Sequence, residues 1–161
     1  MSERSPHLTL QFLAEPTDVN FGGKVHGGTV MKWIDQAGFT AAAGWSGQYC
    51  VTVALGGIRF VAPVRISDLV TVSARLVRTG RTSMHFGVGV RARNPMGGDD
   101  RLCTHCIIVF VAVDRETGAP VQVPSWTPAS EKDRHLFEYA EKVMALSKDI
   151  EEKLARYAPE R

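Results

Sequence analysis

Two stretches in the middle of the chain alternate between apolar and polar residues, the pattern of half-buried β-strands. In residues 69–78 the apolar positions are Val70, Val72, Ala74 and Leu76. In residues 82–93 they are Met84, Phe86, Val88, Val90 and Ala92. Because Thr79-Gly80-Arg81 separates the two stretches, the pattern predicts an antiparallel pair joined by a tight hairpin turn.

Three further stretches complete a predicted sheet. Residues 102–113 are apolar on both faces in their second half, which indicates a strand covered on both sides. Residues 8–13 and 49–60 are the other candidate strands. Within the latter, Gly56-Gly57 predicts a bulge or the close approach of another part of the backbone.

The segment from Gly27 to about Ala43 predicts a helix that is apolar on nearly every side and therefore buried. A turn at Gly44-Trp45-Ser46-Gly47 is expected to end this helix. Residues 36–58 carry no charge, but glycines and polar residues interrupt them, so we expect two buried elements rather than a membrane span. The order of strand, buried helix and four antiparallel strands indicates an α+β fold with a sheet wrapped around one helix.

A long helix is predicted for residues 130–158, after a proline-containing linker at 121–129. Ser130 and Asp133 resemble a capping box at the start of this helix. A heptad-like seam with steps of three and four follows, formed by Leu136, Ala140, Val143, Ser147, Ile150, Leu154 and Tyr157. Two interpretations stay open: the helix packs on its own domain, or its seam faces a partner.

Length and composition indicate one globular domain. The 161 residues are enough to bury a real core, and 44% of them are hydrophobic and 22% charged. This composition excludes a disordered chain, a collagen-like chain and a disulfide scaffold. The net charge of +2 gives no general attraction to nucleic acid, so we expect neither a nucleic-acid partner nor a membrane partner.

The three cysteines favour a reducing compartment. They cannot all pair with one another, and the first residues lack the apolar segment of a signal peptide, so we expect a cytoplasmic protein. Cys103-Thr104-His105-Cys106 looks like half of a metal site. Because it has no second pair of ligands and leads into an apolar strand, we predict no metal there.

Arginines are concentrated in the middle of the chain. Residues 59–101 contain eight arginines, three aspartates and no lysine. The arginine fork suits phosphate groups better than the lysine ammonium does. The excess therefore agrees with a small phosphorylated ligand, although a solvated strand face explains it equally well.

Asp35 is the exception in the predicted apolar helix. Burying a carboxylate is costly unless the group is paired or used. Lys32, three residues earlier, offers a surface ion pair. Alternatively, a partly buried carboxylate beside an apolar pocket suits general-base catalysis.

A second candidate feature leads from Asn20 through a glycine-rich loop to Gly27 and Gly28, at the predicted helix start. Free backbone N–H groups and the helix dipole at such a position favour an anion or a developing oxyanion. The two glycines would let a ligand carbonyl come close. An ordinary glycine-rich turn explains the same residues, and His26 beside them is more typical of a loop anchor than of a base.

Five segments stand in order along the chain: residues 16–28, Trp33-Ile34-Asp35 with the small residues to Ala43, Phe60-Val61-Ala62-Pro63-Val64 with Asp68, Thr79-Gly80-Arg81-Thr82-Ser83-Met84, and Val111-Ala112-Val113-Asp114. In this order they resemble the hotdog-fold acyl-CoA thioesterases of the brain acyl-CoA hydrolase type. The resemblance covers residues 6–120, the expected thioesterase domain. The C-terminal helix lies outside it.

The resemblance implies a five-stranded antiparallel sheet around a central helix and a dimer, often assembled into a trimer of dimers. It implies hydrolysis of acyl-CoA to a free carboxylic acid and CoA, without any other cofactor. The sites would lie between protomers, with Asn20 from one chain and Asp35 from the other as catalytic residues. Gly27 and Gly28 would polarise the thioester carbonyl, and CoA would contact Arg59, Thr79, Gly80, Arg81, Thr82 and Ser83.

One segment departs from the family pattern. The family commonly has an acidic residue in the strand before the Phe60 landmark. Here residues 54–59 contain an arginine, Arg59, and no acid, so ligand contacts there are expected to differ. The phenylacetate-pathway type of hotdog thioesterase shares the His-Gly-Gly segment and the helix aspartate.

Two other function classes stay open. A hotdog dehydratase acting on hydroxyacyl thioesters needs a histidine base, and only His26 is near. A non-catalytic acyl-CoA binder would bind the ester without releasing thiol.

Overall fold

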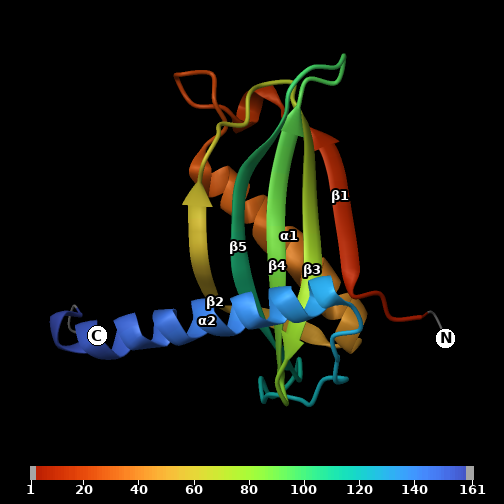
Figure 1. Cartoon of the computed structure of the whole chain (residues 1–161), viewed down its shortest axis with the longest axis vertical. Coiled ribbons are helices and arrows are strands. Elements are labelled where there is room, and N and C mark those ends of the chain that lie inside the picture. Colours follow the sequence, from red (N-terminus) through yellow and green to blue (C-terminus); the bar gives the residue numbers. More distant parts are fainter. Residues whose placement is uncertain (1–2, 159–161) are drawn as a thin grey trace.

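The computed structural model describes residues 3–158 and confirms the predicted α+β fold with one five-stranded antiparallel sheet (Figure 1). Every predicted strand is present, and the last begins two residues earlier than expected. The elements are β1 (His7–Leu13), α1 (Gly27–Ser46), β2 (Tyr49–Phe60), β3 (Leu69–Thr79), β4 (Ser83–Arg93), β5 (Asp100–Val113) and α2 (Glu131–Leu154), with 3-10 turns at Pro16–Asp18 and Ala155–Tyr157.

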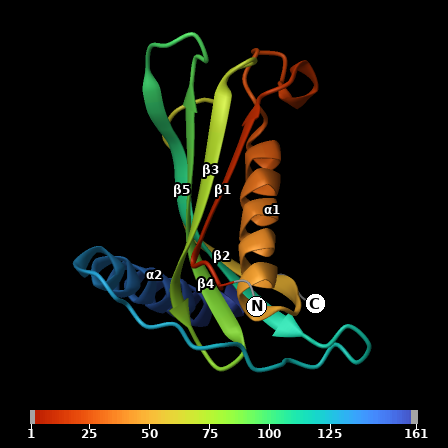
Figure 2. The ribbon, with the colours of Figure 1, turned by 90° about the vertical axis from the view of Figure 1, so that its right-hand side faces the viewer.

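The strand order across the sheet is β1-β3-β4-β5-β2, so β1 and β2 form its two edges. All four pairings are antiparallel, and the register of β2 on β5 shifts between Gly56 and Arg59, in agreement with the predicted bulge. Helix α1 covers one face of the sheet, and α2 lies on the other side (Figure 2). The sheet is therefore the central layer between two helices of different roles.

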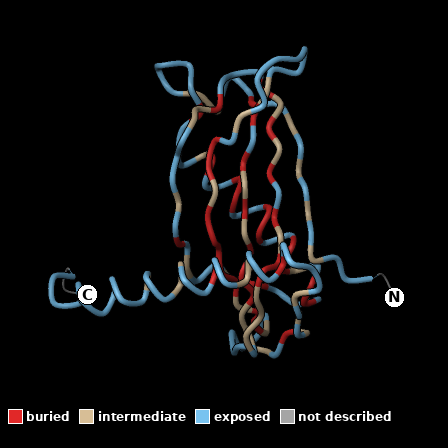
Figure 3. Tube along the Cα trace, in the orientation of Figure 1, coloured by how far each residue is buried: buried red, intermediate tan, exposed pale blue. Residues whose placement is uncertain are grey.

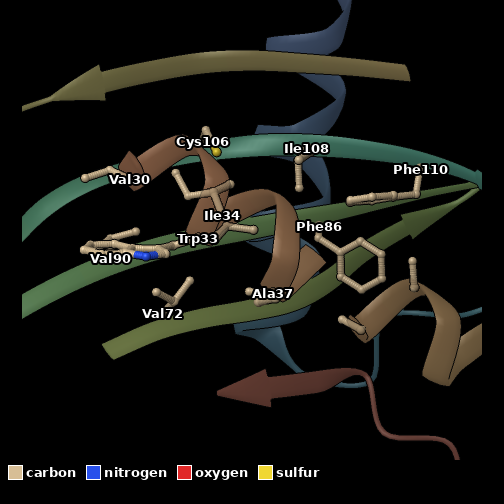
Figure 4. Packing of buried hydrophobic residues seen from close by; sticks show 14 of the residues in the cluster. Val30, Trp33, Ile34, Ala37, Val72, Phe86, Val90, Cys106, Ile108 and Phe110 are labelled. Carbon is tan, nitrogen blue, oxygen red and sulfur yellow. The ribbon is translucent and has the colours of Figure 1, made fainter. Parts of the chain in front are cut away.

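The core lies between α1 and the sheet. Val30, Trp33, Ile34 and Ala37 of α1 pack with the inward side chains of β3, β4 and β5, among them Phe86 and Phe110 (Figure 4). The opposite side of α1 is not covered: Met31 and Phe39 are 42% and 37% exposed. The expectation that α1 is buried all round is therefore wrong for the single chain, because the sheet reaches only one side of the helix.

The predicted end of α1 is also wrong. The helix continues through Gly44-Trp45-Ser46 and ends at Gly47, whose φ of 68° is left-handed. A glycine inside a helix costs about 1 kcal/mol, but Trp45 is buried and its indole N–H donates to the Pro124 carbonyl at 2.9 Å. This packing outweighs the local preference for a turn.

The segment 121–129 is not a free tether. The Val121 N–H donates to the Ala112 carbonyl, and the Val123 N–H donates to the Arg81 carbonyl, each at 2.9 Å. Val123 is buried in the core. The segment therefore runs along the end of the sheet and delivers α2 to the sheet face opposite α1 (Figure 2).

Helix α2 begins with the predicted capping box, in which the Asp133 N–H donates to the Ser130 hydroxyl at 3.0 Å. Asp133 also accepts a hydrogen bond from the Arg75 guanidinium of β3 at 2.5 Å. This guanidinium holds the pKa of the Asp133 carboxyl well below its usual range. One aspartate thus fixes both the start of α2 and its attachment to the sheet.

Neither α1 nor α2, the long helices among residues 3–158, is both long and apolar enough to cross a membrane.

Gly38 sets how closely α1 approaches the sheet. A Cβ at this position would lie 2.6 Å from Cε2 of Phe110 and 3.2 Å from Cγ2 of Ile108, distances that require the neighbours to move. Gly44 lies in the same helix with no atom within 4 Å of the corresponding position. Substitution of Gly38 therefore tests close packing together with helix propensity, whereas substitution of Gly44 tests helix propensity alone.

We predict that Gly38→Ala lowers the free energy of unfolding by about 1–3 kcal/mol, because overpacking exceeds the gain in helix propensity. Gly44→Ala is the matched control and should raise it by up to about 1 kcal/mol. Urea denaturation of the two variants measures both effects. Equal stabilisation by the two substitutions would contradict the close contact at Gly38.

Candidate active site

Asp35 lies on the exposed side of α1, about two turns after the first residue of the helix. Its Oδ1 accepts a hydrogen bond of 2.5 Å from Oγ1 of Thr52, on the edge strand β2. Among the described residues no ion pair joins Asp35 to Lys32, so the surface-pair interpretation is not supported. The expectation of a partly buried Asp35 is wrong for a single chain, because β2 borders the carboxylate without covering it.

Thr52 was missed by the sequence reasoning. It stands in the mostly apolar stretch 49–55, so a single threonine there was the available signal. Only the packing of β2 beside α1 brings this hydroxyl to Asp35, 17 residues earlier in the chain. A hydroxyl donor at 2.5 Å fixes the orientation of the carboxylate.

Asn20 closes the loop before α1. Its side-chain Oδ1 accepts from the backbone N–H groups of Gly22 at 2.9 Å and Lys24 at 3.3 Å. The backbone N–H of Asn20 donates to the Lys24 carbonyl at 2.7 Å. These two donors identify the side-chain oxygen, so the NH₂ group points the other way. Within residues 3–158 this NH₂ group donates to no acceptor, and it is therefore free for a ligand.

A cavity of about 340 Å³ adjoins Asn20. It lies between the start of α1 and the segment after β2, and it is lined mainly by apolar residues, including Gly27, Phe60, Pro63 and Val64. The N-terminus of α1 lies at this end of the cavity. Its first backbone N–H groups have no partner inside the helix, and the positive end of the helix dipole is located there. A Cβ on Gly27 would lie 3.6 Å from the Phe60 ring, whereas Gly28 faces open space.

One chain does not bring Asn20 and Asp35 together. Asp35 is eight residues after Gly27 and does not line the cavity. At 1.5 Å per residue this separation is about 12 Å along the helix. Asp35 thus lies about two turns along α1, whereas Asn20 lies in the loop that precedes the helix.

The turn Thr79–Ser83 lies at the end of the sheet opposite the Asn20 loop (Figure 1). Part of its role is structural, because Oγ1 of Thr79 accepts from the Trp126 N–H at 3.0 Å and the Thr82 carbonyl accepts from the Ala112 N–H at 3.0 Å. Gly80 bonds back to the Ser83 carbonyl at 2.9 Å and closes the hairpin. The Arg81 side chain is exposed beyond this turn.

Most of the concentrated arginines are paired. Arg75 binds Asp133 and Arg101 binds Asp68, while three more form exposed pairs: Arg65 with Asp99, Arg78 with Glu141 and Arg91 with Asp100. Within residues 3–158, Arg59, Arg81 and Arg93 form no ion pair. These three are the arginines still available to a phosphate.

The cysteines and His26 show no sign of catalytic or metal-binding roles. Burial raises the pKa of the Cys106 thiol to about 12, so it is protonated at neutral pH and is a poor nucleophile and ligand. In the described part of the chain no three His, Cys, Asp or Glu residues gather as a metal site would require. His26 precedes α1, and its backbone bonds to Asp18 and Val30 anchor the loop.

Comparisons with known proteins bear on the family of this chain. Residues 22–98 match the family model "Thioesterase superfamily". The acyl-CoA thioester hydrolase YciA of Salmonella typhimurium is 34% identical over 121 residues, 73% of this chain and 90% of that protein. An uncharacterized acyl-CoA thioester hydrolase of Zymomonas mobilis is 36% identical over 71% of this chain and 76% of its own length.

The fold comparison extends over nearly the whole chain. A solved apo-hexameric acyl-CoA thioesterase superposes with a TM-score of 0.84 at 29% identity, covering 89% of this chain and 92% of the other. The matched region includes Asn20's loop only in part, but it contains Asp35, the Phe60 landmark and the Thr79 turn. On these grounds the chain belongs to the hotdog-fold acyl-CoA thioesterase family.

Proposed function

We propose that this protein hydrolyses acyl-CoA thioesters to a free carboxylic acid and CoA. The observation that carries the proposal is Asp35, held by Thr52, in a chain whose relatives at 34% and 36% identity are named acyl-CoA thioester hydrolases. Coenzyme A enters as part of the substrate, and no other cofactor is proposed. The three cysteines among residues 3–158 are unpaired, which supports a cytoplasmic location.

The proposed reaction uses Asp35 as general base. Asp35 takes a proton from water while the water oxygen attacks the thioester carbonyl carbon, and Thr52 keeps the carboxylate oriented. The free NH₂ group of Asn20 and the N–H groups of Gly27 and Gly28 stabilise the negative carbonyl oxygen. Breaking the C–S bond then releases the CoA thiolate, a good leaving group. Direct attack by Asp35, with water cleaving the resulting anhydride, uses the same residues.

We infer that the complete site forms between two copies of the chain. Separation of Asn20 from Asp35 within one chain supports this, as do apolar side chains exposed beside Asp35. These side chains lie on α1 and on the edge strand β2: Met31, Phe39, Tyr49, Val53 and Leu55. A long apolar edge strand is normally paired. We therefore propose that β2 pairs with β2 of a second copy and that dimers assemble into a trimer of dimers, as the hexameric relative suggests.

We propose that the CoA phosphates contact Arg59 and Arg81, with the turn Thr79–Ser83 placing the latter. The lack of ion pairs for these two arginines within residues 3–158 supports the assignment, because a guanidinium without a carboxylate partner is available to phosphate.

A dehydratase is less well supported. The buried His85 has its pKa lowered to about 4 by burial and by Arg78, and it lies away from the Asn20 loop.

Asp35→Asn should lower kcat for thiol release from acyl-CoA by about 10²–10⁴-fold, since the amide cannot accept the proton. The amide can keep the Thr52 hydrogen bond, and the side chain is exposed, so the urea midpoint should stay unchanged. Wild-type kcat in this variant would end the assignment of Asp35. A chain that binds acyl-CoA but releases no thiol even as wild type would instead be a non-catalytic binder.

Thr52→Val should lower kcat by about 10–100-fold, the effect of removing one hydrogen bond to a charged group. Thr52→Ser keeps the hydroxyl and should recover most of the activity. Thr40→Val, on the exposed side of α1 with its hydroxyl bonded to the Gln36 carbonyl, is the control and should be nearly neutral. Similar kcat values for Thr52→Val and Thr40→Val would show that Thr52 does not orient the base.

Complementation tests whether each site takes residues from two chains. Asn20→Ala and Asp35→Ala are each expected to be inactive alone. After joint refolding, random pairing should restore about a quarter of the wild-type specific activity, because half of the dimers are mixed and each has one intact site. Native mass spectrometry verifies the mixing. No recovery in verified mixed dimers would place both residues in a site within one chain.

A further inference from the structure

The last part of α2 exposes a row of apolar side chains. Leu146, Ile150 and Leu154 are 63%, 57% and 52% exposed, and Tyr157 continues the row. Figure 3 shows this end of the helix as exposed along its length. Within the described residues, nothing of this chain covers the row.

The same row is packed in the first part of α2. Leu136, Ala140, Val143 and Met144 form a cluster with Val77 of β3 and Ile107 of β5. Where the helix reaches β2, a Cβ on Gly56 would lie 3.0 Å from Oγ of Ser147 and 3.1 Å from Cγ1 of Val143. The absence of side chains at Gly56 and Gly57 therefore lets α2 lie directly on the edge strand.

The apolar seam of α2 thus has two parts: it is packed as far as the edge of the sheet and exposed beyond it. Figure 1 shows α2 running across the strands and extending past β2. From Ser147, above Gly56, to Tyr157 is ten residues, or about 15 Å at 1.5 Å per residue. We call this exposed end of the helix, residues 146–157, the overhang. With strands about 4.8 Å apart, it has the length needed to cover about three further strands.

We propose that residues 146–157 pack on the outer face of the sheet of a second copy of this chain. The inference rests on the proposed pairing of β2 across the dimer, which would continue this sheet beneath the overhang. Its apolar row lies on the same side of the helix as the residues already packed on the sheet, so it faces such an extension. Two-fold symmetry would make the contact reciprocal, each helix covering the other's sheet.

The polar side of the overhang fits this occupant better than a lipid surface. Lys153 bonds to Asp149 at 2.9 Å, and Lys148 lies 3.9 Å from Glu152. These neutralised pairs keep the outer side of the helix solvated. A helix that binds anionic lipid carries an excess of cations on that side.

Ile150→Gln with Leu154→Gln tests the surface without changing the charge. Sedimentation equilibrium should give a dimer dissociation constant at least tenfold above that of the wild type. The control is Asp149→Asn with Glu152→Gln, on the polar side of the same segment, and it should leave the constant unchanged. Circular dichroism checks that the helix remains. A wild-type constant for the Ile150 and Leu154 variant would overturn the proposal.

Photo-crosslinking identifies the occupant directly. A benzophenone amino acid in place of Leu154, in a tagged chain mixed with untagged wild type, should give a covalent tagged–untagged dimer. The same group in place of Glu152 should give little. Crosslinks confined to a single chain would overturn the proposal.

Thiol release from acyl-CoA by the wild type is measured in parallel. If the wild type releases thiol while neither the dissociation constant nor the crosslink shows the helix contact, the proposal about α2 fails and the function stands. If the contact is found and no thiol is released, the proposed function fails alone.

Discussion

The packing of one side of α1 against the sheet is the contact on which the rest of the structure depends. It buries Ile34 and Ala37 completely and brings the helix so close to β5 that a Cβ at position 38 would require Phe110 to move. Because this contact fixes the rotation of the helix, it also determines which residues point away from the core. Asp35 is one of them, and it meets β2 at Thr52.

The single chain leaves much of its apolar surface uncovered, and the uncovered parts are adjacent. The edge strand β2 contacts both helices: Thr52 bonds to Asp35 of α1, and Gly56 lies against α2. The two catalytic candidates are apart within one chain: Asn20 lies in the loop before α1, and Asp35 lies in the helix. The proposed association of two copies would both bury this apolar surface and bring the two candidates into one site.

The charged residues divide into those that hold the fold and those left for a ligand. Arg75 and Arg101 attach α2 and the β2–β3 loop through Asp133 and Asp68. Exposed pairs at the other arginines contribute little. The excess of arginine noted in the sequence is therefore mostly structural, and only the unpaired ones support a phosphate contact.

The sequence by itself determined the element order, the hairpin, the bulge at Gly56-Gly57, the capping box at Ser130 and the family resemblance. Each of these depends on local periodicity, on turn residues or on motifs that keep their order along the chain. Only the tertiary structure decided where α1 ends, that Asp35 is exposed, that Thr52 is its partner and that the seam of α2 is half packed. Those outcomes depend on which surfaces meet after the chain has folded, and contacts between residues far apart in sequence leave no local pattern to read.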